Sequence, residues 1–390
     1  MSRVAPAATH RKGEVMKKRV IRLVAGSMLA GVLLLPGAAR AQFGDPGVPQ
    51  MRGDGPPPAA APFRIEKLDP ALDDLIAPDA RPVELARGFG INEGVTWVPD
   101  GGDGFVLVSG LVDNVVYKVT LDGKVTALIE KAGFSGEDPG NTGFQTRAGR
   151  SHVLLIGPSC TGLDSQGRII WCAVNDNRLM RLERDGTRTV IADKGPDGKH
   201  LLSPNDITVL RDDTIYVATN QFGFRNGKVP EGFLESGIWR VKDGTLSLAL
   251  SAKDLGGVPN GITVSPDEKH MYLSAQFKLL RYDIQPDGTL ANRRELGEGE
   301  GIIDGMKVDR LGNIYSTGGA GPGVVRITAP DGRVLGLLRL PIDDSEPKRQ
   351  ICATNVAFGG KDDKTLFIAA CDALYSLPMK VSGIAQGPRP

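Results

Sequence analysis

The sequence predicts an all-β protein: a six-bladed β-propeller with four antiparallel strands in each blade and a ring closed by an N-terminal strand. Two observations lead to this prediction. A short sequence motif, a turn followed by an apolar strand, recurs along the 390 residues. Units of strand, Asp-Gly turn and strand lie between its copies. Short strands in a repeat of about 40 to 50 residues are typical of propellers, in which each repeat forms one sheet.

The recurring motif is clearest at residues 202–209, where a turn ending in Asn205 and Asp206 precedes a short apolar strand. Six copies place one residue each at the same offset before a strand: Glu93, Ser159, Asn205, Asn260, Asp304 and Thr354. Successive positions are 44 to 66 residues apart, and the copies at Ser159 and Thr354 are degenerate. Six copies predict six blades.

Five tight turns predict the outer strands of the blades. An Asp-Gly pair supplies the positive φ of a two-residue hairpin turn. Such pairs follow apolar strands at Asp122-Gly123, Asp185-Gly186, Asp243-Gly244, Asp287-Gly288 and Asp331-Gly332. The last repeat ends in a strand at residues 374–377 with no strand after it. We expect residues 82–86 to pair beside that strand, because closure from both ends of the chain removes an open sheet edge.

The first 41 residues have the pattern of a signal peptide. A basic segment precedes an apolar stretch and an Ala-x-Ala sequence that ends at Ala41, so the mature chain should begin near Gln42. Met16 is an alternative start, and an uncleaved anchor is the alternative interpretation of this segment. Residues 1–41 therefore predict a periplasmic or secreted protein.

Composition divides the rest of the chain into three parts. Residues 42–80 are rich in Gly and Pro, which predicts a flexible leader. The propeller should occupy residues 81–380, and residues 381–390 should form a C-terminal tail. The net charge of +1, without a basic patch, gives no indication of nucleic-acid binding. We expect no membrane span in the mature chain, and a monomer or a small homo-oligomer.

Four cysteines allow three disulfide pairings, and export would allow disulfides to form. Cys160 and Cys172 flank one predicted turn, and Cys352 and Cys371 flank another. We therefore expect two local bridges, each across one hairpin. The alternative is four reduced, buried thiols. The chain has no Cys-x-x-Cys sequence, and its Cys and His do not cluster, which argues against a zinc–thiolate site.

Four of the six repeat positions carry side chains that can present oxygen: Glu93, Asn205, Asn260 and Asp304. In a propeller, the residue before each innermost strand lies at the mouth of the central channel, so these side chains should converge on one axis. Carboxylate and amide oxygens suit Ca²⁺, and two carboxylates balance a divalent charge. Mg²⁺, Mn²⁺ and Zn²⁺ are alternatives. The opposing interpretation is that the Asn and Asp are only turn residues.

In their order and spacing, the repeat segments resemble the family of gluconolactonases, regucalcin and luciferin-regenerating enzymes. The resemblance extends over about residues 82–377. The matching segments are Glu93-Gly94, 203–206, 259–261, 304–306 and 354–360. The family implies a six-bladed propeller with one divalent cation at the channel mouth, held by the four oxygen-bearing positions. Many members hydrolyse sugar lactones, and related propellers hydrolyse organophosphates or other lactones.

Three segments depart from the pattern of that family. Residues 159–160 (Ser-Cys) stand where gluconolactonases often have Asn-Gly, and residues 173–174 (Ala-Val) stand where they often have Glu-His. Residues 220–223 (Asn-Gln-Phe-Gly) replace an Asp-Pro-Pro-Tyr-Gly stretch. We expect these positions and the long loops near them to border the substrate. The predicted substrate contacts are Ser159, Asn220, Gln221 and Arg225.

These patterns together predict an exported, divalent-metal-dependent hydrolase of small lactones or esters, with a gluconolactonase-like activity and the cation as Lewis acid. Asp304 is the first candidate for the base that deprotonates water. Asp206 is the second candidate, although it could instead orient Asn205. Two alternatives remain: a phosphotriesterase or arylesterase on the same scaffold, and a non-enzymatic binding propeller that holds a structural Ca²⁺.

Overall fold

The computed structural model describes residues 60–102, 104–148, 151–299, 301–320, 323–342, 352–384 and 386–388. All of these residues belong to one compact unit of the chain. The predicted signal peptide lies outside the described residues. Within the described part of the chain, no helix has the length and apolar character needed to cross a membrane.

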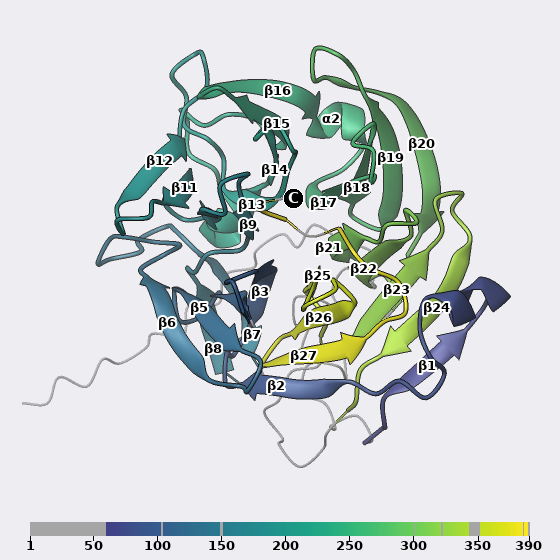
Figure 1. Cartoon of the computed structure of the whole chain (residues 1–390). Helices are drawn as coiled ribbons and strands as arrows, with labels where there is room; N and C mark the ends of the chain where they lie inside the picture. The colour runs from purple at the N-terminus through teal and green to yellow at the C-terminus, as the bar shows by residue number, and fades with distance from the viewer. Residues whose placement is uncertain are drawn as a thin grey trace, which may run out of the picture. The chain divides into compact units, whose positions relative to one another are not determined.

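Six antiparallel sheets follow one another along the chain and around a central axis (Figure 1). The first blade consists of β3 (Asn92–Val98), β4 (Phe105–Gly110), β5 (Val115–Thr120) and β6 (Val125–Glu130). The second consists of β9 (Thr161–Leu163), β10 (Ile169–Ala173), β11 (Arg178–Leu182) and β12 (Arg188–Ala192). The third consists of β13 (Pro204–Val209), β14 (Ile215–Thr219), β15 (Gly237–Lys242) and β16 (Thr245–Ser251).

The other three blades repeat this pattern, with the innermost strand again first in sequence. The fourth consists of β17 (Pro259–Val264), β18 (His270–Ala275), β19 (Lys278–Ile284) and β20 (Leu290–Glu298). The fifth contains β21 (Ile303–Val308), β22 (Ile314–Gly318), β23 (Val324–Thr328) and β24 (Val334–Arg339). The sixth consists of β25 (Asn355–Gly359), β26 (Thr365–Ala370), β27 (Ala373–Pro378) and the N-terminal β2 (Val83–Arg87).

The ring is closed, as the sequence predicts. Each innermost strand contacts the next in the order β3, β9, β13, β17, β21 and β25, and β25 contacts β3. Strand β2 pairs antiparallel with β27, with Glu84 opposite Tyr375 and Ala86 opposite Leu374. The predicted six-bladed architecture and its closure by an N-terminal strand are therefore confirmed.

The leader is shorter than we expected. Within the predicted leader of residues 42–80, strand β1 (Arg64–Lys67) pairs with β24 and gives the fifth blade a fifth strand. The 3-10 turn η1 (Pro70–Asp74) follows it, and the buried side chains Leu72, Leu75 and Ile76 pack in the cluster between the fifth and sixth blades: they are at most 2% exposed. Burial of these apolar side chains fixes the segment against the propeller. The Gly/Pro-rich composition of the neighbouring residues gives no sign of this packing.

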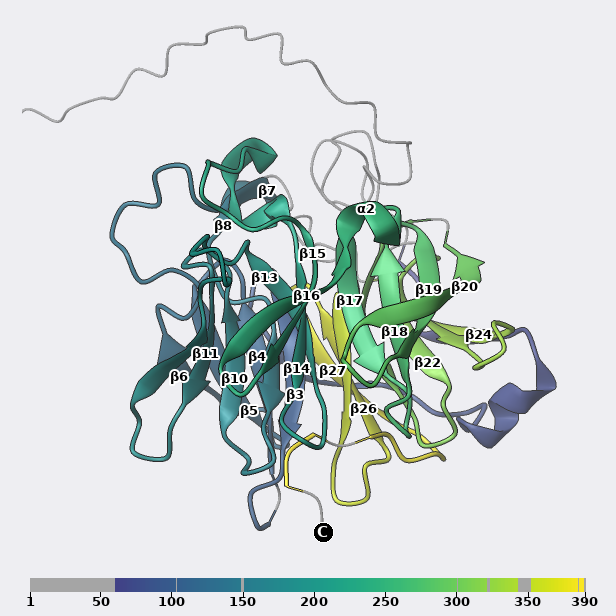
Figure 2. The same cartoon turned by 90° about the horizontal axis from the view of Figure 1, so that it is seen from above.

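The predicted C-terminal tail also contacts the propeller. Ile384 N donates a hydrogen bond to Val308 O in the fifth blade at 3.3 Å, and Gln386 Oε1 accepts one from Leu163 N in the second blade at 3.2 Å. Both contacts lie at the ends of innermost strands. In Figure 2 the coloured part of this C-terminal segment lies at the opposite end of the propeller from the hairpin β7–β8 (Phe144–Ala148 and Ser151–Leu155).

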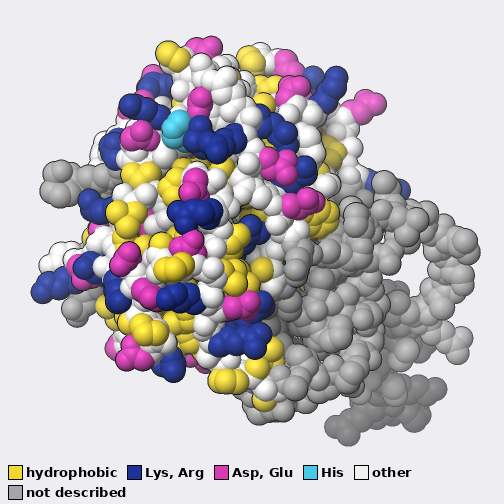
Figure 3. Space-filling model, turned by 90° about the vertical axis from the view of Figure 1, so that its right-hand side faces the viewer, with side chains coloured by type: hydrophobic (Ala, Val, Ile, Leu, Met, Phe, Trp, Pro, Cys, Tyr) yellow, Lys and Arg dark blue, Asp and Glu magenta, His cyan; other side chains and the backbone are white. Residues whose placement is uncertain are grey.

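Apolar layers between neighbouring sheets hold the blades together. All six residues of β4 are buried, because neighbouring blades cover both of its faces. Between the first and sixth blades, Trp97 stacks on Phe367 with ring centroids 5.5 Å apart. Each side chain of this kind contributes about 1.5–3 kcal/mol on full burial. The outer face in Figure 3 shows basic and acidic side chains interspersed, in keeping with a net charge of +1.

Both predicted disulfides are present. Cys160 is bonded to Cys172 with a Cα–Cα distance of 5.0 Å, and Cys352 is bonded to Cys371 with a Cα–Cα distance of 5.5 Å. The first bridge joins the residue that precedes β9 to β10 of the same blade. The second joins the segment before β25 to the turn between β26 and β27.

Removal of the second bridge should destabilise the fold without touching the cavity described below. We expect the double variant Cys352→Ala, Cys371→Ala to lose about 2–4 kcal/mol of unfolding free energy, because the bridge restricts the unfolded chain. Urea unfolding under non-reducing conditions measures the loss. The parent protein in reductant loses both bridges and should show a shift at least as large. An unchanged midpoint of the double variant would contradict a stabilising bridge.

Candidate metal centre and cavity

β-bulges interrupt four of the six innermost strands. The register shifts at or next to Glu93 in β3, Asn205 in β13, Asn260 in β17 and Asp304 in β21. A bulge leaves one residue out of the ladder and redirects its side chain. The innermost strand of the sixth blade, β25, pairs with β26 without such a shift. The bulges therefore accompany the four oxygen-bearing positions of the repeat.

These strands begin at a cavity of roughly 510 Å³, a volume that includes its open mouth. It is lined by Glu93, Leu111, Phe144, Leu155, Gly157, Ser159, Val174, Asn175, Asn205, Phe222, Asn260 and Asp304. The structure thus brings all four predicted ligands, and Ser159 with them, to the lining of one cavity.

Glu93 and Asp304 place two carboxyl groups in this lining. Burial raises the pKa of Glu93 well above its usual value of 4.5, and the negative charges of Asp304 and then Asp206 raise it further. Asp304 is itself only 5% exposed. Two buried carboxyl groups this close repel each other when both are ionised, so the arrangement favours a shared proton or a cation.

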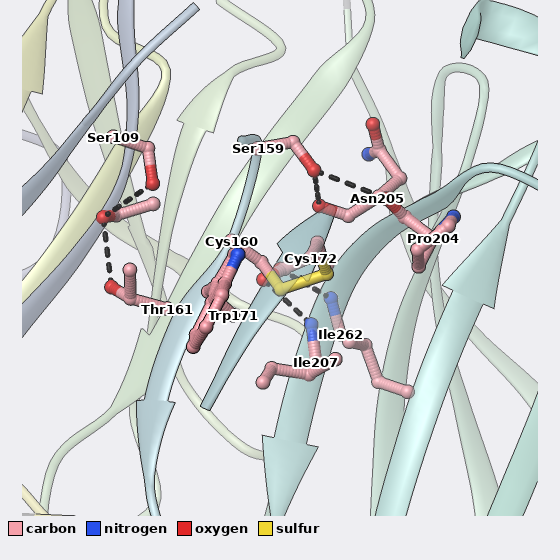
Figure 4. Close-up of a disulfide and its surroundings, with 12 residues drawn as sticks. Ser109, Ser159, Cys160, Thr161, Trp171, Cys172, Pro204, Asn205, Ile207 and Ile262 are labelled. Atoms are coloured by element: carbon pink, nitrogen blue, oxygen red, sulfur yellow. Dashed lines mark hydrogen bonds between the residues drawn. A yellow bond between two sulfur atoms is a disulfide. The ribbon is translucent and has the colours of Figure 1, made fainter. Parts of the chain in front are cut away.

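Two amides and a hydroxyl complete the polar part of the lining. Asn205 Nδ2 donates a hydrogen bond to Asn260 Oδ1. Ser159 Oγ lies 2.6 Å from Asn205 O and 3.2 Å from Pro204 O, and hydrogen-bonds to both carbonyls (Figure 4). Cys160, the residue after Ser159, is held to β10 by its disulfide with Cys172, which fixes the backbone next to Ser159. The backbone that carries Asn205 is thereby tied to the second blade.

The donor set fits a hard divalent cation. It offers two carboxylates, whose charges would offset a divalent charge, and two amides that can present oxygen, as Ca²⁺ sites do. Among the described residues there is no group of three or more His, Cys, Asp or Glu side chains arranged to hold a metal. The amide oxygens are therefore needed to complete a ligand set here.

Asp206, the second candidate base, does not line the cavity. Its Oδ1 accepts a hydrogen bond from Ile207 N at 2.9 Å, and its Oδ2 accepts one from Ile262 N at 3.1 Å. Both oxygens are engaged with backbone amides of β13 and β17. These contacts join two blades beside Asn205 and favour the alternative role of Asp206, which is to position Asn205 rather than to act as the base.

Three predicted substrate contacts, Asn220, Gln221 and Arg225, also lie outside the cavity lining. Asn220 is fully buried: its Nδ2 donates to Pro259 O at 3.2 Å, and its Oδ1 accepts from Phe222 N at 3.0 Å. Its amide therefore caps a short turn and ties it to the fourth blade. The nearby residue that does line the cavity is Phe222.

Val174 and Phe222 lie in segments that we expected to border the substrate, and both line the cavity. Sequence reasoning did not single out the other apolar residues of the lining, Leu111, Phe144 and Leu155. Departures from the family pattern were the signal for Val174 and Phe222. Val174 stands in one of the segments that depart from the family pattern, and the other departure at residues 220–223 contains Phe222. Phe144 and Leu155 belong to a long connection between the first two blades, for which the repeat offers no equivalent position.

Two insertions come together beside the mouth of the cavity. One is the hairpin β7–β8, and the other contains the 3-10 turns η2 (Gln221–Gly223) and η3 (Arg225–Gly227). Gly143 N donates to Gly223 O at 2.9 Å, and the rings of Phe144 and Phe222 pack edge to face at 5.5 Å. The two insertions therefore hold each other in place (Figure 2).

A family model described as SMP-30/Gluconolactonase/LRE-like region matches residues 144–372, which is more than half of the chain. The chain belongs to this family. It is 28% identical over 341 residues to a gluconolactonase of Zymomonas mobilis, an alignment that covers 82% of this chain and 87% of the relative. A 6-deoxy-6-sulfogluconolactonase of Pseudomonas putida is 36% identical over 164 residues, 38% of this chain and 53% of the relative.

Solved structures of this SMP-30/gluconolactonase/LRE-like family share the fold. A gluconolactonase from Xanthomonas campestris superposes with a TM-score of 0.65 and 25% identity, over 83% of this chain and 99% of that one. A luciferin-regenerating enzyme superposes with a TM-score of 0.55 and 17% identity over 83% of this chain, which shows the fold alone.

Close approach of the innermost strands at the ring requires glycine in this family member. A Cβ on Gly261 would lie 2.1 Å from Asp304 O, and a Cβ on Gly94 would lie 2.6 Å from Ser159 O. Both glycines directly follow a predicted ligand. Glycine at these positions therefore lets the innermost strands pack closely enough for the predicted ligands to reach one cavity.

We expect Gly261→Ala to cost roughly 1–3 kcal/mol of unfolding free energy, because the added methyl group overpacks the site and displaces the Asp304 backbone. Cation affinity, measured by isothermal titration, should fall with it. Gly102→Ala is the matched control, since its Cβ would meet nothing nearer than 3.7 Å. Equal effects of the two substitutions would contradict the role of Gly261.

Proposed function

We propose that the protein is a lactone hydrolase that depends on a divalent cation, Ca²⁺ in the first instance, held by Glu93, Asn205, Asn260 and Asp304. The observation that carries this proposal is the convergence of two buried carboxyl groups and two amides on the lining of an open cavity. The relationship to gluconolactonases supports a lactone as the substrate class.

When bound, the cation would polarise the lactone carbonyl and stabilise negative charge on its oxygen. The chain's own residues supply the rest of the chemistry. Asp304 accepts the proton of the attacking water and returns it to the ring oxygen as the C–O bond breaks, so lactone and water give one hydroxy acid. The hydrogen bond between Asn205 and Asn260 orients both amides, and the hydrogen bond from Ser159 Oγ to Asn205 O fixes the backbone of Asn205.

Export is part of the proposal. The pattern of residues 1–41 indicates a cleaved signal peptide, and two disulfides suit an oxidising compartment. We therefore propose a periplasmic or secreted protein that begins near Gln42. N-terminal sequencing of the protein recovered from the periplasm or the medium tests this. Retention of residues 1–41 in that fraction would contradict cleavage.

Hydrolysis of a substrate panel, before and after chelation, tests the function. We expect a lactone to be hydrolysed, activity to disappear with a chelator, and Ca²⁺ or another divalent ion to restore it. Preferred hydrolysis of a phosphotriester or an aryl ester would favour the related hydrolase on the same scaffold. Cation binding without turnover of any lactone or ester would indicate a binding propeller.

A further inference from the structure

Apolar side chains from separate segments border the cavity beside the four candidate ligands. Leu111 follows β4, Phe144 and Leu155 belong to the hairpin β7–β8, Val174 follows β10, and Phe222 lies in η2. They come from the connections of three different blades. These positions make an apolar wall next to the polar ring.

One polar side chain interrupts this wall. Asn175 lines the cavity, is 5% exposed, and has a buried Oδ1 with no hydrogen-bond partner in the described structure. A buried amide oxygen without a partner is unfavourable, because it has lost its hydrogen bonds to water and no protein donor replaces them. A hydrogen-bond donor on a bound molecule would satisfy it.

The balance of the lining favours some substrates over others. A polyhydroxylated ring would have to bury several hydroxyl groups against side chains that cannot hydrogen-bond to them, which disfavours binding. An alkyl or aryl substituent in the same place would remove apolar surface from water on both sides. The wall is also largely preformed, since backbone hydrogen bonds and the Phe144–Phe222 contact join its two insertions.

We infer that the substrate is a lactone whose ring carries an apolar alkyl or aryl substituent, with one hydrogen-bond donor near the ring that faces Asn175, rather than a sugar lactone. This inference rests on the proposed lactonase function. The ring carbonyl would lie at the four ligands, the substituent against Phe144, Leu155 and Phe222, and the donor at Asn175 Oδ1.

Three lactones of similar ring size test the substituent: glucono-δ-lactone, unsubstituted δ-valerolactone and a δ-lactone with a linear alkyl chain. The alkyl lactone should have the largest kcat/KM, at least about 10-fold above glucono-δ-lactone, a ratio within the reach of a few methylene groups. Phe222→Ser should lower kcat/KM for the alkyl lactone by about 10-fold and leave that of δ-valerolactone within about 3-fold.

Leu311→Ser is the matched control for the Phe222 substitution. Leu311 is 64% exposed in the turn between β21 and β22, at the other end of the innermost strand from the cavity, so the ratio of the two lactones should not change. Preferred hydrolysis of glucono-δ-lactone, or an unchanged ratio in Phe222→Ser, would overturn this inference and leave the lactonase function standing. Failure to hydrolyse any lactone would overturn the proposed function itself.

Asn175 is tested with a pair of lactones of equal chain length. An N-acyl-homoserine lactone has an amide N–H beside the ring, whereas a γ-alkyl-γ-lactone has none. Asn175→Ala should raise KM for the first by about 10-fold and change KM for the second by less than about 2-fold, because only the first loses a hydrogen bond to a buried group. An equal change for both would mean that Asn175 does not contact the substrate.

Discussion

Replacement of Asp304 by Asn should lower kcat/KM for a lactone by about 10²-fold or more, the usual effect of removing a positioned acid–base group. Asn keeps the size and one oxygen of the side chain but removes both the charge and the proton acceptor. Saturating cation should not restore the activity if Asp304 is the base. Full recovery at high cation concentration would mean that the carboxylate only binds the ion.

The pH dependence of unfolding free energy, measured without cation, separates this loss of activity from misfolding. Because the pKa of Glu93 is raised in the folded state, its ionisation destabilises the cation-free protein as the pH rises from about 4.5 through the raised value. Asp304→Asn removes one of the charges that raise this pKa, so the cation-free variant should lose less stability over that range. Asn260→Asp is the contrasting variant: it adds a charge, and should keep or tighten cation binding without abolishing turnover.

A chain that begins after Arg87 should fail to form the native propeller. It would lack β2, which closes the sixth blade, and the buried residues Leu72, Leu75 and Ile76. At about 1.5–3 kcal/mol for each buried side chain, these three alone approach the roughly 5–15 kcal/mol that stabilises a typical folded protein. Thermal unfolding followed by near-ultraviolet circular dichroism should show no cooperative transition.

A chain that begins at residue 60 is the control for that truncation. It retains β1, η1 and β2, and should unfold at the same temperature as the mature protein. A cooperative transition in the shorter chain at an unchanged temperature would show that the ring is stable without N-terminal closure.

The ring of blades could be predicted because its signals are local and repeated. Asp-Gly turns and alternating apolar strands return at similar spacing. The strand expected at residues 82–86 had one unpaired sheet edge available, beside the strand at residues 374–377. The fifth strand of the fifth blade has no counterpart in the repeat. Burial of η1 beside it holds this strand in place, and an ion pair from Arg339 Nε to Glu66 Oε2 at 2.8 Å accompanies the pairing; a local pattern reveals neither contact.

The site was only partly predictable for a similar reason. Glu93, Asn205, Asn260 and Asp304 share a repeat offset, so the period alone placed them together. Asp206 follows Asn205 directly, but the bulge sends consecutive side chains to different surroundings, and only the three-dimensional hydrogen bonds of Asp206 show this. Part of the apolar wall, namely Phe144, Leu155 and Phe222, comes from insertions, whose positions the period does not specify.

The C-terminal segment links two blades that are not neighbours in the ring. Ile384 is held at β21 and Gln386 at β9, strands of the fifth and second blades, which lie on opposite sides of a ring of six. Both contacts lie at the end of the innermost strands that is remote from the cavity. The described chain therefore has one more tie between its two halves, besides the contacts of neighbouring blades and the N-terminal closure, and this tie acts at the end of the propeller remote from the cavity.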